Sequence, residues 1–162
     1  MNKICYVSDF LLEDLVGGGE LNDKVLCDML NKSGFDVTRK RSNQIDFDNI
    51  ELDIFYIISN FSNLKDSVKK YIQHNCKYII YEHDHKYLIT RNPAMYDEYK
   101  APKSHIINEE FYKKAKMVFC QSSFHLDIIR KNIHLTNLYN ISGNLWSENS
   151  LNIMKTLGDK KK

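Results

Sequence analysis

Short apolar runs alternate with helix-like segments along most of this chain. The strongest runs are nearly unbroken and short, as expected of strands buried on both faces of a sheet: residues 4–7, 54–58, 78–81 and 117–120. Two weaker runs, at 35–38 and 137–141, add further candidate strands. The segments between them carry apolar residues at helical spacing. This alternation predicts an α/β fold, a Rossmann-like parallel sheet with helices on both faces in three α/β/α layers.

Size and composition restrict the class of protein. With 162 residues, the chain is long enough for a single domain with its own core. Its net charge of +2 is too small to favour nucleic acid as a partner. The four cysteines are widely spaced without a Cys-x-x-Cys pair, and no apolar run reaches the length of a membrane span. No secretory signal opens the sequence, so we expect a cytoplasmic protein without structural metal or transmembrane segment.

Three glycines, Gly17, Gly18 and Gly19, stand between the first candidate strand and a helical pattern that begins at Leu21. Glycines let the backbone approach a ligand closely, and a helix start directs unpaired N–H groups and a partial positive charge at it. The spacing matches neither the dinucleotide fingerprint nor the Walker loop. The run therefore indicates either an anion site or a flexible turn without a ligand. The helical pattern places Asn22 and Asp23 on its outer, polar face.

The segment Glu82-His83-Asp84-His85 directly follows a candidate strand. A metal site would need a third ligand that the sequence does not supply. A general base or a contact to a sugar hydroxyl needs fewer residues, because histidine and carboxylates bond hydroxyls and titrate near neutral pH. A purely structural reading is that His83 bonds backbone at the sheet edge.

Both unusual segments follow strands of a sheet that we expect to be parallel. In such sheets ligands bind beyond the carboxyl ends of the strands, so the glycine run and the segment 82–85 are expected at one edge. The connection from 86 to 105 has little periodicity and carries Tyr87, Arg91 and further tyrosines. Loops of this length are usually functional or disordered. It is read either as a wall of a sugar site or as a mobile surface loop.

The order of these motifs resembles the N-terminal domain of GT-B glycosyltransferases, in particular the retaining enzymes that use nucleotide sugars. In that family a strand, a Gly-Gly loop and a helix open the domain. A later strand ends in His-Asp, and another ends in Ser before a helix. The matching segments here are 17–20, 83–84 and 120–123, and the resemblance covers residues 3–146.

The resemblance implies roles for individual residues. The loop that would lie against the donor diphosphate consists of Gly17, Gly18, Gly19 and Glu20. The catalytic pair beside the reacting sugar would be His83 and Asp84. The acceptor site would contain Glu82, His85, Tyr87, Arg91 and Ser122. The donor, a UDP- or GDP-sugar, is a substrate, so no cofactor is implied.

The resemblance also implies a domain division. Residues 1–146 would form the Rossmann-like acceptor-side domain, and 147–162 a segment leading into a second domain, with a basic tail. The second Rossmann-like domain, which in this family holds most of the donor, has no counterpart in the sequence. A half-cleft cannot position donor against acceptor, so we expect little transfer without a partner domain in trans.

Two other functions fit the same residues. One is a stand-alone Rossmann-like module that binds a nucleotide or another phosphorylated ligand without catalysis. The other is a metal-dependent hydrolase built on Glu82, His83, Asp84 and His85. Stabilisation by a nucleotide sugar only with a partner domain would favour the transferase, by a free nucleotide alone the binding module, and by a divalent metal the hydrolase.

Overall fold

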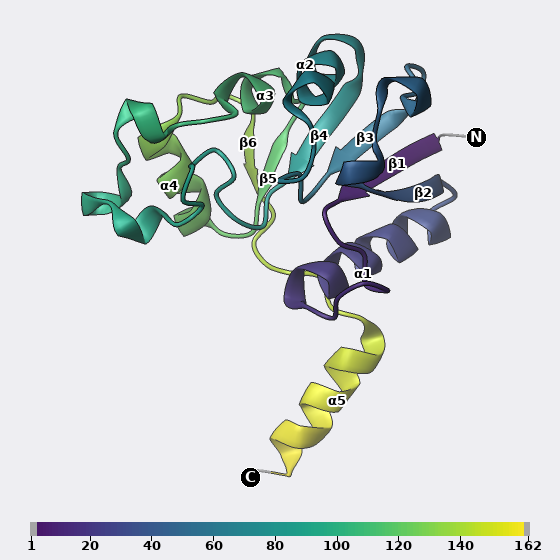
Figure 1. The fold of residues 1–162 in the computed structure, drawn as a ribbon. Coiled ribbons are helices and arrows are strands. Elements are labelled where there is room, and N and C mark those ends of the chain that lie inside the picture. The colour runs from purple at the N-terminus through teal and green to yellow at the C-terminus, as the bar shows by residue number, and fades with distance from the viewer. Residues whose placement is uncertain (1–2, 161–162) are drawn as a thin grey trace.

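The computed structural model describes residues 3–160. Its sheet has six parallel strands in the order β2-β1-β3-β4-β5-β6 (Figure 1). The strands are β1 (Lys3–Ser8), β2 (Asp36–Arg41), β3 (Phe55–Ile58), β4 (Lys77–Tyr81), β5 (Val118–Cys120) and β6 (Leu138–Asn140). The helices are α1 (Gly18–Lys32), α2 (Asp66–Asn75), α3 (Glu109–Lys114), α4 (Ser123–Asn132) and α5 (Glu148–Asp159). The α/β fold with a parallel sheet, predicted from the alternation of runs, is confirmed.

The two faces of the sheet build two cores. In β1, Cys5 and Val7 point into the larger core under α2, α3 and α4, whereas Ile4 and Tyr6 point toward α1. Side chains of a strand alternate between faces, so an unbroken apolar run is what a strand covered on both sides requires. Helices therefore lie on both faces, giving the three layers expected (Figure 1).

The order in which successive strands are added to the sheet reverses between β1 and β3. From β1 the chain crosses to β2 on one side, then returns to β3 on the other side and proceeds outward through β6. At such a switch point the loops leaving neighbouring strands diverge, which opens a crevice beyond their carboxyl ends. The glycine run follows β1, and the segment 82–85 follows β4, two strands away. Both lie at the same edge of the sheet, as expected.

The face that carries α1 is only partly covered. A hollow of about 440 Å³ lies over β3, β4 and β5, between α1 and the segment 141–145. Its walls are apolar, with Ile79, Tyr81 and Phe119 from the strands and Leu26 and Leu30 from α1. Parallel sheets are normally buried on both faces, so this part of the sheet lacks a partner among residues 3–160.

The last helix, α5, extends away from the sheet (Figure 1). Ser147 caps it, its Oγ accepting a hydrogen bond from the Ser150 N–H at 3.1 Å. None of the described residues of α5 is buried, and its apolar side chains Leu151, Met154 and Leu157 are exposed. The basic tail predicted from the sequence falls largely on Lys161 and Lys162, outside the described residues.

Candidate functional site

The first turn of α1 is open to a ligand. Gly17 is the N-cap with extended backbone, φ −130° and ψ 170°, and within residues 3–160 no side chain makes a capping hydrogen bond there. The N–H groups at the helix start are thus left for an acceptor, and the helix dipole favours one with negative charge. A Cβ at Gly18 would meet nothing within 4 Å, and one at Gly19 would lie 4.0 Å from Cδ2 of His83. The helix start and His83 therefore face one space.

His83 is held by two side chains. Its Nε2 hydrogen-bonds Oδ1 of Asp23 at 2.5 Å, and Gln121 Nε2 lies 2.7 Å from its Nδ1. Because a carboxylate only accepts and an amide nitrogen only donates, Nε2 carries the proton and Nδ1 accepts. Asp23 is buried, whereas Gln121 is partly exposed. Nε2 is thus engaged by the buried Asp23, and Nδ1 by Gln121, a residue that lines the cavity.

Asp23 connects the site to the ends of two strands. Its carboxylate accepts from Ser8 Oγ at 3.3 Å, at the end of β1, and from Ser59 Oγ at 3.0 Å, directly after β3. The expectation that Asp23 and Asn22 lie on the outer face of the helix is wrong, because both are buried, at 5% and 3% exposure. The first turns of α1 face the polar ends of the strands, where burying a side chain that is hydrogen-bonded costs little.

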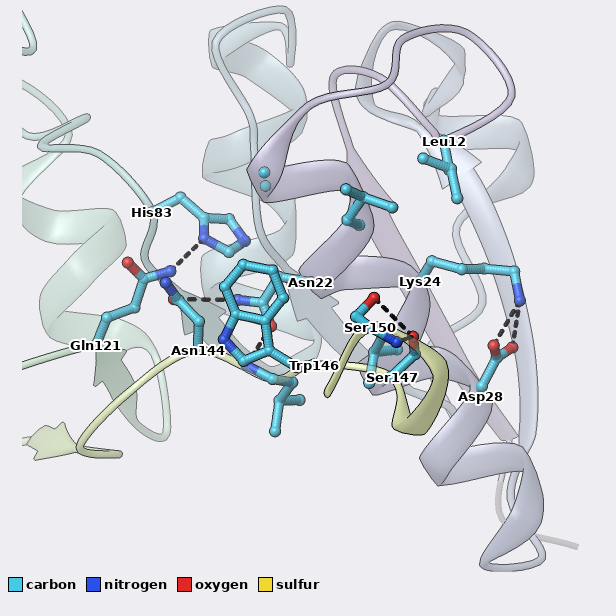
Figure 2. Close-up of a pocket in the computed structure, with 15 residues that line it drawn as sticks. Leu12, Asn22, Lys24, Asp28, His83, Gln121, Asn144, Trp146, Ser147 and Ser150 are labelled. Carbon is cyan, nitrogen blue, oxygen red and sulfur yellow. Dashed lines mark hydrogen bonds and ion pairs between the residues drawn. The ribbon is translucent and has the colours of Figure 1, made fainter. Parts of the chain in front are cut away.

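A cavity of about 450 Å³ is lined by the start of α1, His83 and Gln121 (Figure 2). Asn22 links three chain segments at this cavity. Its Oδ1 accepts hydrogen bonds from the Leu145 N–H at 3.0 Å and from the Tyr81 hydroxyl at 3.2 Å. Its Nδ2 donates to Asn144 Oδ1 at 3.4 Å. These bonds hold the segment 144–147 along the cavity. The wall residues include Leu12, Gly18, Gly19, Leu21, Asn22, Lys24, Asp28, His83, Gln121, Asn144, Trp146, Ser147 and Ser150.

Of the residues expected against the donor, Gly18 and Gly19 line the cavity and Gly17 caps the helix directly behind them. Glu20 is buried and does not line it. A Cβ at position 17 would collide with the Glu20 carboxylate, so that side chain folds back over Gly17. Glu20 thereby places its own negative charge near the helix start.

The other residues of the segment 82–85 point to different surroundings. Asp84 lies outside the cavity, in contact with Lys86 Nζ and 3.6 Å from Arg91 Nε. Glu82 is fully buried and accepts a hydrogen bond from the Tyr112 hydroxyl. Burial raises the pKa of Glu82, which favours its neutral form. These carboxyl groups are thus engaged within the protein.

His85 belongs to a separate aromatic cluster. Its Nδ1 lies 3.0 Å from the Tyr87 hydroxyl, and its ring is 4.5 Å from that of His125 between centroids. Burial lowers the pKa of both histidines to about 4, so both are neutral at neutral pH. Ser122 caps α4, its Oγ accepting from the His125 N–H at 3.1 Å. Among residues 3–160, no group of three His, Cys, Asp or Glu side chains is arranged to hold a metal.

Several residues that line the cavity or hold its side chains have no signal in the sequence. Asp23, Gln121 and Asn144 come from three separate elements and meet His83 or Asn22 only in the fold. Gln121 stands beside the Ser expected at the end of its strand, and that position was the one available hint. Within residues 3–160 no helix is long and apolar enough to cross a membrane.

Comparisons with known proteins show the fold and no more. No protein family and no curated protein matches the chain. A solved structure of an alpha-glucosyltransferase in complex with UDP and a 13-mer DNA containing a HMU base is similar, with 14% identity and a TM-score of 0.51. The likeness covers 85% of this chain and 41% of that one, so the chain spans less than half of its length. A Streptococcus pneumonia TIGR4 flavodoxin, at 14% identity over 98% of this chain and 94% of its own, has a TM-score of only 0.35.

The class that the fold defines is therefore a Rossmann-like α/β domain. At the level of fold alone, it is similar to part of a glycosyltransferase that was solved with UDP. This agrees with the GT-B resemblance of the motifs at that coarse level.

Proposed function

We propose that this chain is the acceptor-side half of a glycosyltransferase that uses a nucleotide-sugar donor. One observation carries the proposal: the uncapped start of α1 and His83 line a single cavity at the carboxyl edge of the sheet. A helix start binds the diphosphate of a nucleotide sugar, and a histidine beside it reaches the sugar. The fold-level likeness to a glucosyltransferase solved with UDP supports the same assignment.

In this proposal the N–H groups of Gly18 and Gly19 bind the donor diphosphate, because glycine lets its oxygens approach the backbone. His83 Nδ1 hydrogen-bonds a hydroxyl of the transferred sugar after Gln121 rotates away. Asp23 keeps the proton on Nε2 and fixes the orientation of the ring. Asp84 lies outside the cavity, and its proposed part in catalysis is to act through Arg91, which is 3.6 Å away.

The proposal includes a second domain. One side of the cavity is formed by 144–147, the segment that leads into α5, and α5 exposes apolar side chains on a helix with no packing partner among residues 3–160. Residues 1–146 are proposed as the acceptor-side domain, and 147–162 as the connection to a donor-binding domain in the same or another chain. Closing the cavity against that domain would exclude water from the reacting sugar.

The test measures the binding of UDP-glucose through the amide resonances of the isotope-labelled protein. We expect millimolar UDP-glucose to shift the amides of Gly18 and Gly19, and glucose alone to leave them unchanged. The matched variant His83→Gln should keep these shifts, because His83 is placed at the sugar. Shifts confined to other residues, or no shift at all, would refute the donor site. A divalent metal that shifts His83 and His85 together would favour the hydrolase instead.

A further inference from the structure

A separate cavity, of about 240 Å³, lies between the segment after β3, the helix α2 and the long loop after β4. It shares no wall residue with the cavity at α1. Its volume is far above the roughly 15 Å³ that a single water needs. Its polar wall residues are Ser62, Lys69, Lys86, Arg91 and Asn108, and the rest of the wall is apolar.

Three cationic side chains meet in this cavity. They come from different parts of the chain: Lys69 from α2, and Lys86 and Arg91 from the loop. The side chain of Lys86 is 2% exposed and that of Lys69 is 12% exposed. Removing an ammonium group from water is costly unless negative charge compensates it. The Arg91 side chain is 50% exposed and stays hydrated, so the two lysines are the cations that require compensation.

The carboxylates of the protein compensate only part of this charge. Asp84 is shared, touching Lys86 and lying 3.6 Å from Arg91. Glu82 lies 3.7 Å from Lys86, but burial raises its pKa and so weakens its negative charge. Asp66 pairs with Lys69 at 2.7 Å, but it is 86% exposed. Asp84 is shared by two cations and water screens the exposed Asp66, so these carboxylates compensate the lysines only in part.

Hydrogen-bonding groups complete the site. Ser62 Oγ accepts from Arg91 Nη1 at 2.8 Å, which holds the guanidinium at the cavity and leaves the hydroxyl hydrogen free to donate. Asn108 Oδ1 accepts from Lys69 Nζ at 2.7 Å, and its Nδ2 donates to the Lys86 carbonyl oxygen at 2.8 Å. Asn108 thus fixes both lysines in place.

We propose that Lys69, Lys86 and Arg91 form a binding site for a phosphate group carried by the acceptor. A phosphate group offers several charged oxygens, which matches a planar guanidinium and two point charges better than a single carboxylate does. The loop that carries Lys86 and Arg91 closely follows His83 in the chain, so we assign this phosphate to the acceptor. That assignment rests on the proposed function. The binding of phosphate itself does not depend on the proposed function.

The test titrates the protein with inorganic phosphate at constant ionic strength and follows the amide of Asn108 together with the melting temperature. We expect stabilisation of the wild type and at least tenfold weaker binding in Lys69→Gln and Arg91→Gln. The matched control Lys70→Gln removes an exposed neighbouring charge on α2 and should bind like the wild type. Equal affinity in Arg91→Gln and the wild type would overturn the proposal. So would phosphate that shifts Gly18 and Gly19 in place of Asn108.

A sugar phosphate separates an acceptor phosphate from the free ion. Glucose 6-phosphate should bind more tightly than inorganic phosphate, and equal or weaker binding would overturn the assignment to an acceptor. The failures of the two proposals are distinguishable. Phosphate binding lost in Arg91→Gln, with no effect of UDP-glucose on Gly18, would leave this site standing and refute the transferase. The reverse pattern would refute this site alone.

Discussion

Replacing Gly19 by alanine should separate ligand binding from stability at the start of α1. Gly19 is the second residue of the helix, and its backbone does not need glycine, since its φ lies outside the left-handed range. The added Cβ would meet only His83 Cδ2, at 4.0 Å, which is ordinary contact. It would project into the space where the diphosphate is proposed to lie. The variant should therefore fold normally and lose the donor.

The magnitudes follow from helix propensity and from the bonds lost. Alanine stabilises a helix interior by about 0.5–1 kcal/mol relative to glycine, and we take the lower figure because position 19 is in the first turn. For a domain of this size that corresponds to a rise of about 1–2 °C in melting temperature. Displacing the phosphate from one charged hydrogen bond costs roughly 1.5–3 kcal/mol, or about 10- to 100-fold in UDP affinity.

The assay is calorimetric unfolding combined with a UDP titration, and Gly34→Ala is the matched control. Gly34 has φ +88°, a left-handed conformation that alanine adopts at a cost of roughly 1–2 kcal/mol, and it lies at the far end of α1. It should lower the melting temperature while UDP binding is kept. A fall of several degrees in the melting temperature of Gly19→Ala, or an unchanged affinity for UDP, would contradict a donor site at this glycine.

Three further predictions concern buried polar groups. Because burial lowers the pKa of His85 and His125 to about 4, the unfolded chain takes up protons first as the pH falls below about 6.5. The free energy of unfolding, measured by urea titration, should fall between pH 7 and pH 5, by about 1–2 kcal/mol for His125. In His125→Gln this fall with pH should be smaller. Tyr112→Phe should cost about 1–3 kcal/mol in urea unfolding, because it leaves the buried Glu82 carboxyl without its donor. An unchanged midpoint would contradict that bond. Asp23→Asn should destabilise the fold by a similar amount and shift the His83 ring resonances, whereas a spectrum identical to the wild type would show that the two side chains do not meet.

The predictable part of the site is the part that follows directly from a strand. A strand end and the residue after it are positioned by local pattern, so the sequence was sufficient to bring Gly18, Gly19 and His83 to one edge. Where His83 and Asp84 point was not predictable. They are adjacent, yet one faces the cavity at α1 and the other faces Lys86.

Local pattern along the chain was sufficient to predict the alternation of strands and helices, the parallel sheet and the loops that carry the candidate site. The contact of Asp23 with His83 across 60 positions of chain, and the placing of Lys69 with Lys86 and Arg91 around one cavity, came from the packing of whole elements. Periodicity and turn residues act over only a few neighbours in the chain. The partners of a buried polar group, in contrast, are set by how whole elements pack, and that packing is fixed mainly by apolar contacts elsewhere.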